Sequence, residues 1–261
     1  MRGTLIICAD YESLSREAAR RFAAALEGSK QRTFHIALAG GGTSRRLYEL
    51  LATSEFERKI PWERVHLFWG DERMVPLDHP KSNYKLARDS LLKHVRLPPK
   101  NIHPVQVNLP PEQAAAAYEQ ELRSVIGGRW SVPVFDLTLL GLGDDGHTAS
   151  LFPRAASLQE KQKLVTTHRM AGTEPARVTL TLPVLNAAKR VFFLVSGESK
   201  ATALRTVVEG TGQLPAHLVA PRGGELLWLA DTAAASKLKG VRVQPAAAEP
   251  AHSAVVSKAE P

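Results

Sequence analysis

The fold is decided by a strand, a glycine-rich turn and a helix that follow one another in residues 34–51, which read FHIALAGGGTSRRLYELL. Phe34–Ala39 is a short, mostly apolar run of the length expected for a buried strand. Three glycines at 40–42 break this run, and Leu47 and Leu51 then recur at helical spacing. The stretch therefore predicts a β-strand that turns directly into an α-helix.

The same alternation continues on both sides of this unit. It predicts an α/β fold in which a mostly parallel sheet is covered by helices on both faces. No internal repeat or proline-rich linker interrupts the pattern, so we expect a single domain over residues 1–239. From residue 240 the composition shifts to Ala, Pro, Glu and Ser, and residues 240–261 are expected to be a disordered tail. The predicted strands are Leu5–Ala9, Phe34–Ala39, Val65–Trp69, Phe135–Leu140, Arg177–Thr181, Arg190–Val195 and Leu226–Ala230, and the predicted helices include Tyr11–Glu27, Ser82–Val95, Pro110–Ile126, Glu198–Glu209 and Asp231–Leu238.

Composition narrows the class of protein. Of 261 residues, 44% are hydrophobic and 23% charged, so there is enough apolar material for a core. Cys8 is the only cysteine, which excludes an internal disulfide and a cysteine-based zinc site, and its apolar surroundings predict burial. The first apolar run spans only five residues, and no stretch approaches the ~20 residues of a membrane span, so we expect a cytoplasmic protein.

The formal net charge is +8, and the basic residues are scattered along the chain. This is typical of a solvated basic surface, and it would also attract an anionic substrate. Without a basic run or a recognition module, nucleic acid is not an expected partner.

The glycine turn itself has the features of a phosphate site. Gly40, Gly41 and Gly42 allow a ligand to approach the backbone closely, and the first amides of the next helix offer N–H groups and partial positive charge. Thr43 and Ser44 add hydroxyls. The turn lacks the last glycine of a dinucleotide-binding fingerprint and the Gly-Lys-Ser/Thr of a P-loop. An ordinary tight turn is the alternative.

Polar residues also follow the strand at Val65–Trp69, namely Asp71, Glu72 and Arg73. Ligands of open α/β sheets bind beyond the carboxyl ends of the strands, so these side chains are candidates for substrate contact. A surface cluster of ion pairs is the alternative.

The strand at Phe135–Leu140 leads into residues 141–153, GLGDDGHTASLFP. This loop presents His147 beside Asp144 and Asp145. A histidine titrates near neutrality and suits general base chemistry, and a neighbouring carboxylate can fix its tautomer. The residues do not decide which of the two aspartates does so.

Two further cations stand at the ends of predicted elements. Arg177 heads a strand, and Lys200 opens a helix after another strand. A guanidinium grips phosphate as a fork and an ammonium adds a mobile point charge. With the glycine turn they predict a phosphate held from three sides.

Residues 141–153 resemble the signature of the 6-phosphogluconolactonase family. Residues 70–76, GDERMVP, and the later Ser82-Asn83-Tyr84 resemble further segments of it, and the likeness runs in order almost to residue 239. The resemblance implies a modified Rossmann-like fold shared with the glucosamine-6-phosphate deaminases. It implies hydrolysis of 6-phospho-D-glucono-1,5-lactone to 6-phospho-D-gluconate in the oxidative pentose phosphate pathway, with no metal and no organic cofactor.

The resemblance also implies roles for individual residues. His147 would be the general base, with Asp145 or Asp144 steadying its ring. Arg73 and backbone amides of Gly141–His147 are the candidate donors to the developing oxyanion. The remaining residues are Asp71 and Arg73 beside the lactone, and Gly41, Gly42, Thr43, Ser44, Arg73, Arg177 and Lys200 around the phosphate. This chain departs from many relatives at Gly40, where they have serine, and at Ser44, where they have proline.

Two other functions remain open from the sequence. One is an amino-sugar phosphate deaminase or isomerase, but that family carries a glutamate five residues beyond the histidine, where this chain has Phe152. The other is a non-catalytic sugar-phosphate sensor, although no helix-turn-helix segment precedes Leu5. The expected partner is a small phosphosugar lactone, and the protein is expected to be a monomer or a small homo-oligomer.

Overall fold

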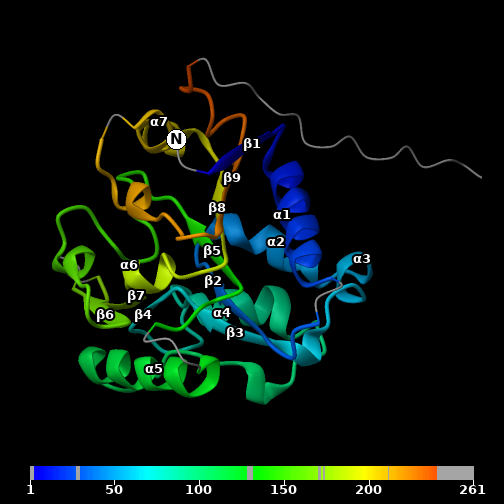
Figure 1. The fold of residues 1–261 in the computed structure, drawn as a ribbon, viewed down its shortest axis with the longest axis vertical. Helices are drawn as coiled ribbons and strands as arrows, with labels where there is room; N and C mark the ends of the chain where they lie inside the picture. The colour runs from blue at the N-terminus through cyan, green and yellow to red at the C-terminus, as the bar shows by residue number, and fades with distance from the viewer. Residues whose placement is uncertain are drawn as a thin grey trace, which may run out of the picture.

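A six-stranded, wholly parallel sheet forms the centre of the computed structural model, which describes residues 3–27, 30–127, 132–169, 172, 174–210 and 212–239 (Figure 1). Each strand is a short apolar run and is buried along most of its length. The order across the sheet is β1 (Thr4–Cys8), β9 (Glu225–Asp231), β8 (Arg190–Val195), β5 (Leu137–Gly141), β2 (Phe34–Leu38) and β3 (Val65–Trp69).

Helices cover both faces of this sheet because alternate strand residues point to opposite sides. Ile36 and Leu38 of β2 pack with one apolar cluster, whereas Ala37 between them packs with the other. In Figure 1, α1 and α2 lie on one side of the sheet and α6 and α7 on the other. The helices are α1 (Tyr11–Leu26), α2 (Gly42–Leu51), α3 (Ser54–Glu57), α4 (Asn83–Ala87), α5 (Pro111–Ile126), α6 (Leu182–Leu185) and α7 (Ala201–Glu209).

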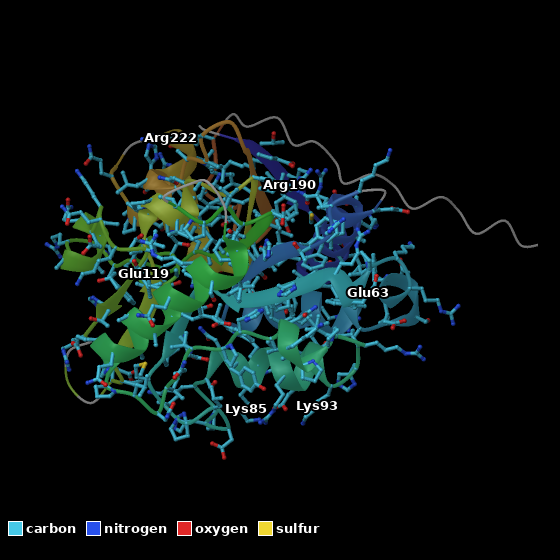
Figure 2. The ribbon with its side chains drawn as sticks, turned by 60° about the horizontal axis from the view of Figure 1, so that its bottom comes forward. Glu63, Lys85, Lys93, Glu119, Arg190 and Arg222 are labelled. Atoms are coloured by element: carbon cyan, nitrogen blue, oxygen red, sulfur yellow. The ribbon has the colours of Figure 1, made fainter. Side chains whose placement is uncertain are left out.

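A second, antiparallel sheet lies beside the first, in the order β4 (Asp71–Arg73), β7 (Arg177–Leu180) and β6 (Val165–His168). The strand predicted at Arg177–Thr181 therefore exists but does not join the parallel sheet. Helix α5 covers this small sheet, and Glu119 of α5 accepts hydrogen bonds from the amides of Leu164 and Val165 at 2.8 and 3.4 Å (Figure 2).

Some predicted helices differ from those observed. The helix expected at Ser82–Val95 begins at Asn83, capped by Ser82, widens into the π-helical turn η2 (Arg88–Leu92) and ends there. The first turn expected at Glu198 is the 3₁₀ turn η5 (Glu198–Lys200).

The helix expected at Asp231–Leu238 is wrong. The structure has successive turns there, since the Asp231 carboxylate accepts from the amide of Ala234 at 2.7 Å and so binds the chain locally.

Other short 3₁₀ turns connect the main elements, namely η1 (Trp62–Arg64), η3 (Pro99–Asn101), η4 (Ala156–Gln159) and η6 (Pro215–Leu218).

Among the described residues, no helix is long and apolar enough to cross a membrane. Residues 240–261 lie outside the described part of the chain, and the single domain over residues 1–239 stays a prediction.

Candidate active site

A cavity of about 290 Å³ opens at the carboxyl ends of the parallel strands. It lies between β2 and β5, where the chain leaves the sheet in opposite directions, which is the usual ligand position in such folds. Three cations and one histidine face the same space as the glycine turn. Its polar and glycine lining comprises Gly40, Gly41, Gly42, Thr43, Gly70, Asp71, Arg73, Gly141, Gly143, His147, Arg177 and Lys200.

The glycine turn brings the start of α2 to the cavity. Gly41 caps the helix with φ of +85°, a conformation that glycine adopts without strain. Gly42 and Thr43 line the cavity. Because the first amides of an α-helix have no partner within the helix, they are candidate donors to a ligand there. Ser44 is different: its side chain is buried, donates to the Gly40 carbonyl at 3.2 Å, and does not line the cavity.

Gly40 is required by its neighbour. A side chain there would meet the amide group of Asn83, whose oxygen lies 2.0 Å from the ideal Cβ position. Asn83 in turn donates to the Asp71 backbone carbonyl at 2.8 Å. Gly40 therefore allows the glycine turn to pack closely against Asn83 at the start of α4.

The loop after β5 fixes His147 through its backbone and its ring. The amide and the Nδ1 of His147 both lie against the Asp145 carboxylate, at 3.0 and 2.6 Å. Gly143 leaves room for this ring, because a Cβ there would lie 2.0 Å from Nδ1. With Nδ1 held by a carboxylate, the favoured neutral tautomer carries its proton there and leaves Nε2 as a proton acceptor.

Asp145 remains ionised at this position. Partial burial raises its pKa, but hydrogen bonds from the His147 amide and ring outweigh that effect and leave the pKa below the ordinary value. The Asp145 side chain is 51% exposed and lies outside the cavity lining, so it reaches the site only through His147.

A stack of aromatic rings packs against the His147 imidazole. Phe152 stacks on it with ring centroids 4.3 Å apart, and His168 stacks on the other side of Phe152 at 4.7 Å. The guanidinium of Arg177 lies 5.5 Å from the Phe152 ring centre. Burial, Arg177 and His147 together lower the pKa of His168, which keeps it neutral beside these groups. The sequence gives no signal for His168, which comes to the site only through the pairing of β6 with β7.

Asp71 and Glu72 have separate tasks. Asp71 lines the cavity and accepts a hydrogen bond from the Ser150 hydroxyl at 2.7 Å. Glu72 is buried beneath and accepts from the amides of Arg73, Asn83 and Tyr84 at 2.7 to 2.8 Å. Burial raises the pKa of Glu72 despite these hydrogen bonds. Glu72 therefore fastens α4 to β4, whereas Asp71 faces the cavity.

Two arginines lie side by side on the small sheet. Arg73 of β4 pairs directly with Arg177 of β7, and both line the cavity. The Nε of each is buried without a hydrogen-bond partner. Burial and the charge of Arg73 lower the pKa of Arg177, although a guanidinium stays charged at any physiological pH. Two adjoining cations with unused donors form a site for an anion.

Lys200 is the third cation of the cavity and lines it opposite the two arginines. Its Nζ lies 2.5 Å from Asp144, whose carboxylate also accepts from the Ser199 hydroxyl at 3.2 Å. Lys200 lines the cavity, and Asp144 lies at its rim with a 65% exposed side chain. The ion pair with Lys200 lowers the pKa of Asp144.

The structure thus gathers most of the predicted residues around one cavity, and the exceptions are Ser44, Glu72, Asp144 and Asp145, which do not line it. Three of the loop amides expected as oxyanion donors are already engaged, because those of Gly143, Gly146 and His147 donate within the loop. Arg73, the other expected donor, lines the cavity with a buried Nε that has no partner among the described residues. Among the described residues no group of three or more His, Cys, Asp or Glu side chains is arranged to hold a metal ion.

Comparison with known proteins identifies the family of this chain. The family model for glucosamine-6-phosphate isomerases and 6-phosphogluconolactonase matches residues 9–228. The chain belongs to this family. A 6-phosphogluconolactonase from Synechocystis sp. is 46% identical over 211 residues, which cover 78% of this chain and 84% of the relative.

Solved structures of the family confirm the predicted fold class. The 6-phosphogluconolactonase from Trypanosoma brucei matches with a TM-score of 0.82 at 30% identity, over 91% of this chain and 99% of that one. A monomeric glucosamine-6-phosphate deaminase matches with a TM-score of 0.75 at 24% identity, over 91% and 100% of the two chains, which shows a shared fold. The family resemblance predicted from residues 141–153 is therefore confirmed, and it extends over most of the chain.

Proposed function

We infer that this chain hydrolyses 6-phospho-D-glucono-1,5-lactone to 6-phospho-D-gluconate in the oxidative pentose phosphate pathway. One observation carries the inference: a carboxylate-held histidine opens into the same cavity as a lysine, a helix N-terminus and two guanidinium groups, each with a buried Nε that has no partner among the described residues. The histidine supplies a base for hydrolysis, and the cations supply a site for a phosphorylated substrate. The relatives from Synechocystis sp. and Trypanosoma brucei, which are 30% or more identical and cover most of the chain, are 6-phosphogluconolactonases.

The reaction starts with water held against His147. Nε2 of the neutral imidazole takes a proton from this water as its oxygen adds to the lactone carbonyl carbon. Asp145 stabilises the imidazolium that forms, and Phe152 keeps the ring plane fixed. The catalytic role of His147 is a proposal that rests on this geometry.

The tetrahedral intermediate carries its negative charge on the former carbonyl oxygen. Arg73 stands beside the cavity with an unused buried Nε and is the donor we assign to that oxygen. Collapse of the intermediate breaks the bond between the carbonyl carbon and the ring oxygen. The His147 imidazolium returns its proton to that leaving oxygen, which becomes the hydroxyl of the open-chain acid. Asp71 lies beside the sugar ring as an acceptor for its hydroxyls.

The phosphate lies away from the reacting carbon and fixes the ring against the base. We assign it to Arg177, Lys200 and the first amides of α2 at Gly42 and Thr43, with Gly41 giving room for its approach. Ser44 acts indirectly, since its hydroxyl holds the Gly40 carbonyl. Arg73 borders both regions.

The test is a comparison of substrates with the purified full-length chain. The lactone is generated in place by glucose-6-phosphate dehydrogenase, and its loss is compared with the spontaneous rate. We expect strong acceleration for the phosphorylated lactone and little for glucono-1,5-lactone. Release of ammonia from glucosamine 6-phosphate would instead support a deaminase, and binding of phosphosugar without turnover would support a sensor.

The cellular location, oligomeric state and partners of the enzyme are also proposals. We propose a cytoplasmic monomer or small homo-oligomer whose partner is this small substrate, with no nucleic acid. The buried Cys8 thiol, whose pKa burial raises to about 11, fits a reducing compartment because it is unreactive and unpaired.

A further inference from the structure

Asp144 is the residue of the active-site loop that the proposed reaction leaves without a task. It stands three residues before His147 and directs its carboxylate to Lys200 on the opposite wall. Asp145, its neighbour, is already committed to His147. The two aspartates, which the sequence alone does not tell apart, therefore serve different partners.

The three cations of the cavity are not equivalent. Within the described part of the chain, Arg73 and Arg177 form no ion pair, and each keeps a buried donor without a partner. Lys200 alone is neutralised by a carboxylate. Its side chain is 25% exposed, whereas that of Asp144 is 65% exposed, so the carboxylate sits on the solvent side of the ammonium.

A phosphate that reaches Lys200 meets this carboxylate. Both are anions attracted to the same ammonium, which has three hydrogens, so the phosphate must displace Asp144 or share Lys200 with it. Either event weakens phosphate binding relative to a site with a free lysine. The exposed position of Asp144 lets it turn into solvent without leaving a buried charge.

We propose that Asp144 competes with the substrate phosphate for Lys200 and so sets the affinity of the phosphate site. It keeps the lysine over the cavity between turnovers and lowers the affinity for every ligand that carries the phosphate, including the 6-phosphogluconate product. This proposal rests on the assignment of the phosphate to Lys200 in the proposed function.

The direct test is Asp144→Asn, which keeps the shape of the side chain and removes its charge. Competitive inhibition by 6-phosphogluconate and KM for the lactone are measured at low and high salt. We expect both constants to fall by roughly three- to tenfold at low salt, as for a partly exposed charge acting on a phosphate of about two charges. The difference from wild type should shrink at high salt because screening weakens it.

Matched variants separate this effect from others. Glu225→Gln removes an equal charge from an exposed ion pair with Arg190 at the amino end of the sheet, and should leave both constants unchanged (Figure 2). Asp144→Glu keeps the charge and should stay near wild type. In a Lys200→Ala background, Asp144→Asn should have no further effect, because the competitor has lost its lysine.

The outcomes distinguish this proposal from the proposed function. If wild type binds 6-phosphogluconate no better than gluconate, or Lys200→Ala leaves that binding unchanged, the phosphate assignment itself fails. If both tests succeed but Asp144→Asn leaves the constants unchanged, only the competition is refuted. Weaker binding in Asp144→Asn would also overturn it, since Asp144 would then support Lys200 in binding rather than compete with the ligand.

Discussion

Gly143→Ala should disable the proposed base, His147, without replacing that residue. The added Cβ would lie 2.0 Å from the His147 Nδ1, far inside van der Waals contact, so the ring must move by more than an ångström. That movement breaks the 2.6 Å contact with Asp145 and turns Nε2 away from the water. A displacement of about 1 Å costs on the order of 100-fold, and loss of a general base about 10²–10⁴-fold, so we expect kcat to fall by at least about 100-fold.

The phosphate site should be affected much less, because the three atoms nearest to the added Cβ all belong to His147. KM and inhibition by 6-phosphogluconate should therefore stay within about threefold of wild type. The assay is the coupled lactone assay with spontaneous hydrolysis subtracted, beside a thermal melt.

Gly224→Ala is the matched control for this variant. A Cβ there would also clash, with the Ala188 and Lys189 carbonyls at 2.6 and 2.8 Å, but at the opposite end of the sheet. It should lower stability and leave the kcat of the folded enzyme unchanged. A folded Gly143→Ala enzyme with kcat within threefold of wild type would refute the assigned position of the base.

Two further predictions concern binding and pH. Arg177→Ala should raise KM for the phosphorylated lactone by about 10- to 100-fold through loss of a charged phosphate contact, with a smaller change in kcat; an unchanged KM would remove Arg177 from the phosphate site. Below pH 6.5 the protein should lose stability through His66, whose folded pKa is lowered to about 4 by burial, His103, His35 and Lys100. Because the unfolded state binds the proton first, stability should rise with pH between about 4 and 6.5 and level off above. Full protonation of His66 should cost roughly 1–2 kcal/mol after allowance for its partial exposure. Urea unfolding at pH 5 and 7 should show a smaller difference for His66→Phe than for wild type, and equal differences would contradict the assignment.

The sequence predicts the main sheet well because its strands are short apolar runs. Those runs owe their pattern to burial on both faces, and hydrophobicity alone reveals them. β4 is different: Asp71–Arg73 is polar, and only pairing with β7 makes it a strand. Nor does local pattern show that Arg177–Leu180 joins a separate sheet, since partner choice depends on contacts distant in sequence.

The candidate site likewise contains residues that the sequence predicts and residues that it does not. Cavity-lining residues at the ends of strands, such as His147 and Lys200, are placed by topology and could be predicted. Side-chain direction could not, so Ser44 was expected at the phosphate but faces the Gly40 carbonyl. Distinguishing Asp144 from Asp145 needs the loop conformation, and His168 enters only through the register of β6 with β7.

The most direct test of the account compares wild type with His147→Ala in excess EDTA. Initial loss of 6-phosphogluconolactone is measured against the spontaneous rate, and binding of 6-phosphogluconate is measured in parallel to show that the variant is folded. We predict that wild type accelerates hydrolysis with EDTA present and that His147→Ala loses most of kcat while it still binds the product. Full turnover by a folded His147→Ala, or no acceleration by wild type, would contradict the central claim.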